Sequence, residues 1–182
     1  MNARREEAIS AAVDPKQALE FILFEHMRHR QMCKALEQLA AMPDFDPGRI
    51  ASLADFIRFD LTLHVIDEEE DFFPMLRERC LPDDGIDAVL DQMTDEHAAD
   101  KALSVEVRDV LNACLIERKP PAAIECGAAV LRNFAQHERR HMALENAVVI
   151  PLARRRLAPD DLTSLGERFA ARRRRLASAP GE

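Results

Sequence analysis

Two segments of the chain repeat one spacing of side chains that bind metal ions. His64 is followed four residues later by Glu68, and His141 is followed four residues later by Glu145. Residues four apart lie on one face of an α-helix. Each pair can therefore present an imidazole nitrogen and a carboxylate oxygen to one centre, a mixed donor set that suits transition-metal ions.

The repeat extends on both sides of these pairs. A proline stands ten residues after each histidine, at Pro74 and Pro151. Upstream of each pair stands a Glu-His dipeptide. The two dipeptides are Glu25-His26 and Glu96-His97. We interpret the chain as two related helical hairpins, each contributing two histidines and one glutamate.

The elements that would carry these residues are long helices. Ala, Leu, Glu and Arg, which favour helices, dominate the 182 residues, whereas glycine occurs five times and Tyr and Trp are absent. Proline and glycine divide the chain into stretches with apolar residues at helical spacing. We expect helices at about residues 15–42, 49–80, 86–118, 122–157 and 159–177.

These helix lengths predict an all-α fold. Short loops between long helices make neighbours antiparallel, which gives an up-down-up-down four-helix bundle with a short C-terminal fifth helix. The expected organisation is a flexible N-terminal segment over 1–13, the bundle over 14–158, and the C-terminal helix and tail over 159–182.

Four histidines of the repeat are expected at one depth of this bundle. His26 lies about 15 residues before the first turn and His64 about 16 residues after it. His97 and His141 lie about 21 and 20 residues from the break between the third and fourth helices. At about 1.5 Å per residue, the members of each pair differ in height by only a few ångströms.

A buried layer of four imidazoles and two carboxylates is costly unless the groups are paired or bind metal. The sequence therefore predicts a two-ion centre, with His26 and His64 on one ion and His97 and His141 on the other. In this arrangement the two glutamates of the repeat bridge the ions. The alternative is a polar layer without metal, or a pH-sensitive bundle.

The donor set resembles that of the hemerythrin family, in its HHE cation-binding branch. Ferritin-like di-iron bundles use two Glu-x-x-His motifs, and this chain has one such spacing, Glu138 to His141. The resemblance covers about residues 19–152 and is carried by the two His-x-x-x-Glu segments with their prolines. Carried over by position, it implies the metal ligands His26, His64, Glu68, His97, His141 and Glu145.

The resemblance also implies a cofactor. Members of the family hold two non-haem iron ions joined by an oxo or hydroxo bridge and two carboxylates, with an open position for dioxygen or another small ligand. Manganese or zinc would fit the same donors.

One position departs from the family pattern. Oxygen-carrying members place a second histidine four residues after the third-helix ligand, where this chain has Lys101. One ion is then short of a protein ligand, which weakens the case for oxygen carriage and favours reactions with peroxide or nitric oxide. His137, one turn before His141, is a candidate replacement. His29, one turn after His26, is another candidate. The alternative for both histidines is that they do not bind the metal and lie behind the ligands or at the surface.

Other side chains near the ligands receive structural interpretations. Glu69 and Glu70 are expected to point away from the ligand face into solvent. Asp71, two turns after His64, is a candidate to hydrogen-bond to a metal ligand without binding the metal itself. The phenylalanines expected to pack around the centre are Phe21, Phe24, Phe56, Phe59, Phe72, Phe73 and Phe134.

We expect the protein to bind or sense a small ligand at this centre: dioxygen, nitric oxide or peroxide. Whether it is an enzyme stays open, and one alternative is a metal-dependent oxidoreductase that removes peroxide or nitric oxide. Another is a metal-responsive interaction module with a protein partner on the Arg-rich C-terminal helix. The structural interpretation of those arginines, and of Arg154 to Arg156, is solvated helix faces.

Charge and composition exclude several classes of protein. A net charge of -8 disfavours nucleic-acid binding. No apolar run approaches the roughly 20 residues of a membrane span. The start, Met1 to Arg5, leads into charged sequence without a signal peptide, and the four cysteines are widely spaced. We therefore expect a cytoplasmic protein with reduced cysteines.

Overall fold

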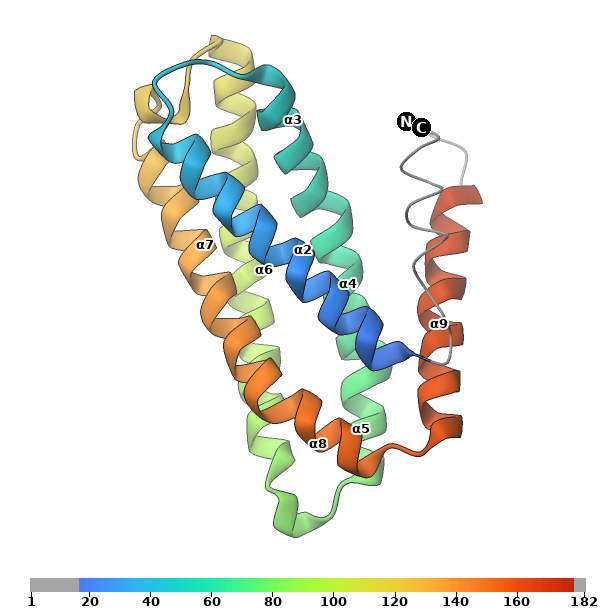
Figure 1. The fold of residues 1–182 in the computed structure, drawn as a ribbon. Coiled ribbons are helices and arrows are strands. Elements are labelled where there is room, and N and C mark those ends of the chain that lie inside the picture. Colours follow the sequence, from blue (N-terminus) through green and yellow to red (C-terminus); the bar gives the residue numbers. More distant parts are fainter. Residues whose placement is uncertain (1–16, 179–182) are drawn as a thin grey trace.

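The computed structural model describes residues 17–178, and every regular element in this part of the chain is helical. The prediction of an all-α fold is confirmed. Long helical rods lie side by side, and α9 stands beside them (Figure 1). The predicted flexible segment over residues 1–13 lies outside the described residues.

Each predicted long helix corresponds to one rod. The first rod is α2 (Ala18–Ala41), and the third is α6 (Ile86–Glu117). The second rod runs without a break through α3 (Pro47–Asp55), η1 (Phe56–Leu61), α4 (Thr62–Asp67), η2 (Glu68–Phe72) and α5 (Phe73–Arg79). The fourth rod consists of α7 (Gly127–Leu144), η5 (Glu145–Val149) and α8 (Ile150–Arg156), and the fifth helix is α9 (Pro159–Ser178).

The fourth rod begins later than the expected start near residue 122. The prolines are followed by a 3₁₀ turn, η4 (Pro121–Ala123), and Cys126 caps α7 with a φ of 56°. Gly127 then allows the chain to pass close to this turn, because a Cβ atom there would lie 2.6 Å from the carbonyl oxygen of Pro121. A turn that tight cannot belong to a continuous helix.

Two short π-helical segments, η2 and η5, begin at the two glutamates of the repeat. The N–H group of Phe73 donates to the carbonyl of Glu68, and that of Ile150 donates to the carbonyl of Glu145, five residues back in each case. A proline follows directly, and its ring would clash with the carbonyl four residues earlier in a regular helix. The wider π turn relieves that clash, and π turns are frequent at functional sites.

The apolar core has two parts, and a polar layer lies between them. One part includes Phe72, Leu90 and Phe169, and the other includes Leu36 and Leu111. Along each of the four long rods, the histidines of the repeat fall between or at the border of the residues that enter these two parts. The apolar packing therefore holds the helices together above and below the layer and keeps it away from bulk water.

Some of the expected phenylalanine packing is wrong. Phe24 and Phe59 are 41% and 48% exposed, whereas Phe21, Phe72 and Phe73 are buried. Phe24 stands two residues before His26 and so lies on the opposite side of α2. Among the residues that the structure describes, no helix is long and apolar enough to cross a membrane.

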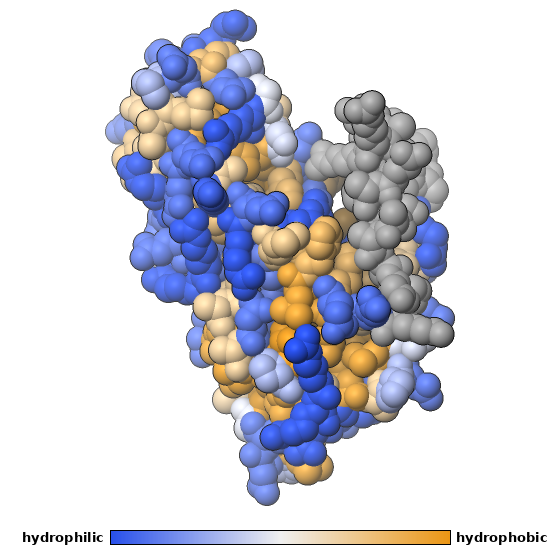
Figure 2. Space-filling model, viewed as in Figure 1, coloured by the Kyte–Doolittle hydropathy of each residue, from blue (hydrophilic) through white to orange (hydrophobic). Residues whose placement is uncertain are grey.

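The fifth helix, α9, packs against α2 and η2. Figure 2 shows hydrophilic residues over most of the visible face of the bundle and hydrophobic residues gathered between its lower part and α9. Leu165 and Phe169 of α9 enter the core there. Two of its arginines are not solvated as expected, because Arg172 and Arg173 contact acidic side chains of the bundle. A protein partner on α9 stays a prediction.

Candidate metal centre

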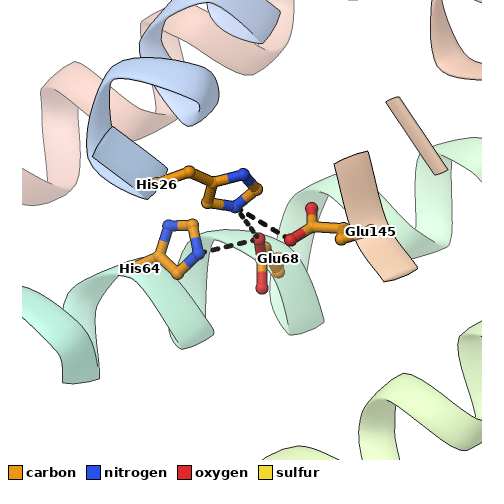
Figure 3. Close-up of side chains that lie close together, drawn as sticks. All are labelled: His26, His64, Glu68 and Glu145. Carbon is orange, nitrogen blue, oxygen red and sulfur yellow. Dashed lines mark ion pairs between the residues drawn. The ribbon is translucent and has the colours of Figure 1, made fainter. Parts of the chain in front are cut away.

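The structure brings all six residues of the predicted ligand set into the polar layer. They form two groups in which one donor atom of each residue lies within 4.8 Å of the others. We call His26, His64, Glu68 and Glu145 the first group (Figure 3). The second group, which shares one residue with the first, consists of Glu68, His97 and His141.

In the first group, α2, α4, η2 and η5 each contribute one side chain. The Nε2 atom of His26 lies 2.8 Å from a Glu145 oxygen, and Nε2 of His64 lies 3.0 Å from Oε1 of Glu68. Figure 3 shows both imidazoles turned toward the two carboxylates. All four side chains are buried.

In the second group, the other oxygen of the shared glutamate faces α6 and α7. Oε2 of Glu68 lies 3.2 Å from Nε2 of His97, and the Nε2 atoms of His97 and His141 lie 3.1 Å apart. The division of the four histidines is the one expected from the sequence. Glu68 touches both groups, whereas Glu145 belongs to the first alone, so a bridging role for Glu145 stays a prediction.

The other ring nitrogen of each first-group histidine, Nδ1, donates a hydrogen bond to a residue outside the group. Nδ1 of His64 donates to Glu25 at 3.2 Å. Nδ1 of His26 donates to the amide oxygen of Asn146 at 3.1 Å, while the amide nitrogen of Asn146 donates to the carbonyl of Met142 at 2.6 Å. Both rings therefore present Nε2 to the centre, as ligand histidines do.

The second-group histidines are held in the same way. Nδ1 of His97 donates to Glu69 at 2.6 Å, and Nδ1 of His141 donates to Glu96 at 3.1 Å. The expectation that Glu69 points into solvent is therefore wrong. Glu69 stands directly after the predicted ligand Glu68, where η2 widens the helix and changes the direction of the next side chain.

Sequence reasoning missed these four supporting residues, although the repeat contains a signal for each. Glu25 and Glu96 are the first members of the two Glu-His dipeptides, and each holds the His of the following helix in its own hairpin. Glu69 and Asn146 stand directly after the two ligand glutamates, and each holds a His of the other hairpin. The repeat therefore includes the residues behind the ligands.

The buried charges of this layer strongly influence one another's pKa values. Burial disfavours the charged form of His26, but the carboxylates of Glu145 and Glu68 together outweigh burial and raise the pKa of His26 to about 9. Burial likewise opposes charge on Glu68, but His64 and its neighbours hold the pKa of Glu68 well below its ordinary value. A buried carboxylate surrounded by imidazoles is a site that a cation can occupy once the imidazole protons leave.

The donor atoms themselves fit a metal. Both oxygens of Glu68 and Glu145, and Nε2 of His26 and His64, are buried and have no hydrogen-bond partner of good geometry among the described residues. Buried polar atoms in this state are expensive unless they bind something. Imidazole nitrogen with carboxylate oxygen is the donor set of non-haem iron and related ions.

A second polar cluster lies beside the second group. Asp100 and Glu138 are both buried and their carboxyl groups interact electrostatically, and Nε2 of His137 lies 3.1 Å from Asp100. Burial, reinforced by the Asp100 charge, raises the pKa of Glu138 to about 8. This carboxyl group therefore keeps its proton near neutral pH.

Three further expectations are settled by these positions. His137 pairs with Asp100 and is in neither metal group, and His29 is in neither group as well. His29 packs edge-on against His64, and burial lowers its pKa well below the ordinary value. Asp71 faces away from the ligands, because its carboxylate pairs with arginines of α9.

Comparison with known families gives the class of this chain. The family model of the Hemerythrin HHE cation binding domain matches residues 17–153. The match covers most of the chain, including all six clustered ligand candidates, so the protein belongs to the hemerythrin HHE family. A comparison with curated proteins gave no match.

Proposed function

We propose that this protein holds two non-haem iron ions, one in each donor group, and uses them to bind or sense dioxygen, nitric oxide or peroxide. The observation that carries the proposal is the shared glutamate. Oε1 of Glu68 faces His64, and Oε2 of the same carboxylate faces His97. A carboxylate whose two oxygens face two separate imidazole sets is suited to bridge two ions.

The chain supplies unequal donor sets to the two positions. The first group has four protein donors, and the second has three. Fewer protein donors leave room for a small ligand, as at metal sites that keep an open position for substrate. When bound, the iron pair would supply electrons and that open position.

A hollow in the surface lies next to the residues that support the second group. It has a volume of about 320 Å³ and is lined by Gln92, Glu96, His137, Arg140 and Leu144. Glu96 also holds His141, and His137 also contacts Asp100, so the hollow reaches the residues directly behind the second group. A diatomic molecule or peroxide is small enough to enter there.

A metal-dependent oxidoreductase is the second candidate, and Glu138 supports it. Reduction of peroxide consumes protons, and Glu138 holds a proton beside the second group. The adjoining Asp100 and His137 lead from this carboxyl group to the surface hollow and could return the proton from solvent. A pure binding protein has no need of such a proton donor.

The proposed function is tested by elemental analysis combined with an absorption spectrum of protein purified in air. About two irons per chain with near-ultraviolet bands, both lost in a His64→Ala, His141→Ala double variant, is the expected result. A folded protein that takes up no iron on anaerobic reconstitution would contradict the proposal. Steady turnover with peroxide and a reductant, slowed in Glu138→Gln, would favour the oxidoreductase over the binding protein.

We also propose a cytoplasmic location for this function. All four cysteines are free, and Cys33 and Cys114 are buried. Free thiols are typical of reducing compartments. Fractionation of the native cells with an antibody to the protein would test this location.

A further inference from the structure

The helix α9 lies beyond the residues that match the family, yet its side chains reach toward the metal centre. The family match ends at residue 153, and α9 begins at Pro159. Arg172 contacts Asp67, Glu70 and Asp71 of the second rod. The helix is therefore fastened by charge to the rod that carries His64 and Glu68.

Arg173 is the most deeply placed of these arginines. Its residue exposure is 8%, and its guanidinium carbon lies 4.4 Å from the centre of the Phe21 ring. One terminal nitrogen donates to Asp67 at 2.5 Å, and the other donates to Glu25 at 2.8 Å. A planar fork can hold two carboxylates in fixed directions, which a lysine cannot do.

The two carboxylates belong to different rods. Glu25 is on α2 beside His26, and Asp67 is on α4, three residues after His64 and one before Glu68. Arg173 therefore ties together the two helices that supply both histidines of the first group.

The contact continues from Arg173 to a predicted ligand. Oε1 of Glu25 accepts from Arg173, and Oε2 of the same carboxylate accepts from Nδ1 of His64. Nε2 of His64 in turn lies 3.0 Å from Glu68. Partners behind ligand histidines set the ring orientation and the basicity of the ligating nitrogen.

Among residues 17–178, no arginine supports the second group in this way. Glu96 occupies the place of Glu25 in the repeat and holds His141, but its other oxygen accepts from Gln92, a neighbour on the same helix. The two halves of the centre are therefore supported differently: from α9 in the first group, and from within α6 in the second.

We propose that Arg173 is a positioning residue for the first metal group, acting through Glu25 on His64, and that docking of α9 and metal binding at this group stabilise each other. The proposal rests on the proposed function, because it requires that the groups bind metal. Coupling between two binding events is reciprocal. Metal bound at the first group is then expected to hold α9 in place. Loss of the arginine contact is expected to lower the affinity of the first group for its metal ion.

A set of matched variants tests the positioning role by anaerobic titration with Fe²⁺, and with Co²⁺ for its visible spectrum. Arg173→Met removes the guanidinium, and Arg174→Met changes an exposed arginine next to it. Arg173→Met is expected to weaken one of the two binding steps about 10- to 100-fold and to alter the Co²⁺ spectrum of that step. Arg174→Met is expected to match the wild type.

A double-mutant cycle tests whether Arg173 acts through Glu25. Glu25→Gln is expected to weaken the same binding step, and Arg173→Met is expected to add little further loss in the Glu25→Gln background. Fully additive losses would overturn the relay. A loss that is equal in both binding steps would also overturn it, because general loosening of the fold does not distinguish the groups.

Two measurements keep the test valid if Arg173→Met folds poorly. Arg173→Lys keeps the charge and the aliphatic stem but cannot hold both carboxylates, so it is expected to weaken the same step. In the wild-type protein, metal is expected to slow hydrogen exchange of the α9 amides, and an unchanged exchange rate would overturn the coupling.

The outcomes separate this inference from the proposed function. Wild-type protein that binds no metal would overturn both. Wild-type protein that binds two ions, together with an Arg173→Met variant of identical affinity, spectrum and α9 exchange, would overturn the inference and leave the proposed function intact.

Discussion

The two halves of the metal centre come from one repeat but differ in their surroundings. The first group has four donors, and its imidazole and carboxylate side chains are at most 2% exposed. The second has three donors, and its two histidine side chains are 5% and 4% exposed. The carboxylates that support these histidines are more accessible: Glu69 and Glu96 have side chains that are 31% and 25% exposed, against 4% for Glu25 in the first half. On the proposed function, this difference favours retention of an ion in the first half and access of a small ligand to the second.

A few departures from the repeat account for this difference. Glu69 in one half corresponds to Asn146 in the other, so a carboxylate supports His97 where an amide supports His26. Arg173 contacts the glutamate behind His64, whereas in the described part of the chain the glutamate behind His141 accepts from Gln92 instead. Small changes outside the predicted ligand set therefore give two chemically similar groups different surroundings.

The largest expected effect comes from removing the residue that the two groups share. Glu68→Ala is expected to reduce metal content from about two ions per chain to nearly none, because each group loses a donor and the bridge between them. Glu145→Ala is expected to affect the first group more than the second. Metal analysis after gel filtration measures both, with Glu125→Ala, at an exposed position away from the centre, as the control.

Metal removal is expected to lower the stability of the fold. An ion that binds only the folded state stabilises it by about 2.7 kcal/mol when its free concentration is 100 times the dissociation constant. Denaturant unfolding at rising Co²⁺ concentration measures this effect. The first equivalent is expected to give most of the gain, since the first group has more donors, and equal gains from both equivalents would contradict the comparison.

The buried acid beside the second group is expected to make the metal-free protein less stable as pH rises. The pKa of Glu138 is raised from 4.5 to about 8. The protonated carboxyl group therefore makes its full contribution to the free energy of unfolding below pH 4.5, and this contribution is lost as pH rises toward 8. Between these pH values, Glu138→Gln is expected to make the free energy of unfolding fall less steeply with pH, by up to about 1.4 kcal/mol per pH unit.

Urea unfolding at several pH values between 4.5 and 8 gives the slopes. Glu125→Gln, at an exposed position with no role in the centre, is the matched control. Parallel profiles for the wild type and Glu138→Gln would show that Glu138 is ionised in the folded protein throughout this range.

The smallest expected effect comes from replacing the carboxylate that supports His97 with an amide like the one that supports His26. Glu69→Gln replaces the carboxylate behind His97 with an amide and so makes the second half resemble the first. It is expected to weaken the second binding step about 10-fold, because a carboxylate behind a histidine raises the basicity of the ligating nitrogen. Calorimetric titration measures the two binding steps separately. If the first step were weakened instead, the first ion would bind at the second group, contrary to the comparison.

The sequence alone predicted the helices and the set of side chains that the structure brings together. Both depend on local spacing: four residues separate His64 from Glu68 and His141 from Glu145, and a helix places such pairs on one face. Apolar periodicity and proline breaks located the rods to within a few residues, apart from the 3₁₀ turn before α7.

Only the tertiary structure decided which residues stand behind the ligands. The contact of Asn146 with His26 joins residues 120 positions apart, and that of Arg173 with Glu25 joins residues 148 positions apart. Such pairs depend on how whole helices pack: the repeat marks the position of Asn146 but not the residue that it contacts, and Arg173 lies outside the repeat. The position of Glu69 was misjudged for a related reason, since a regular helix was assumed where η2 widens the turn. Ligand identity follows from spacing along one helix, whereas support for the ligands follows from contacts between helices.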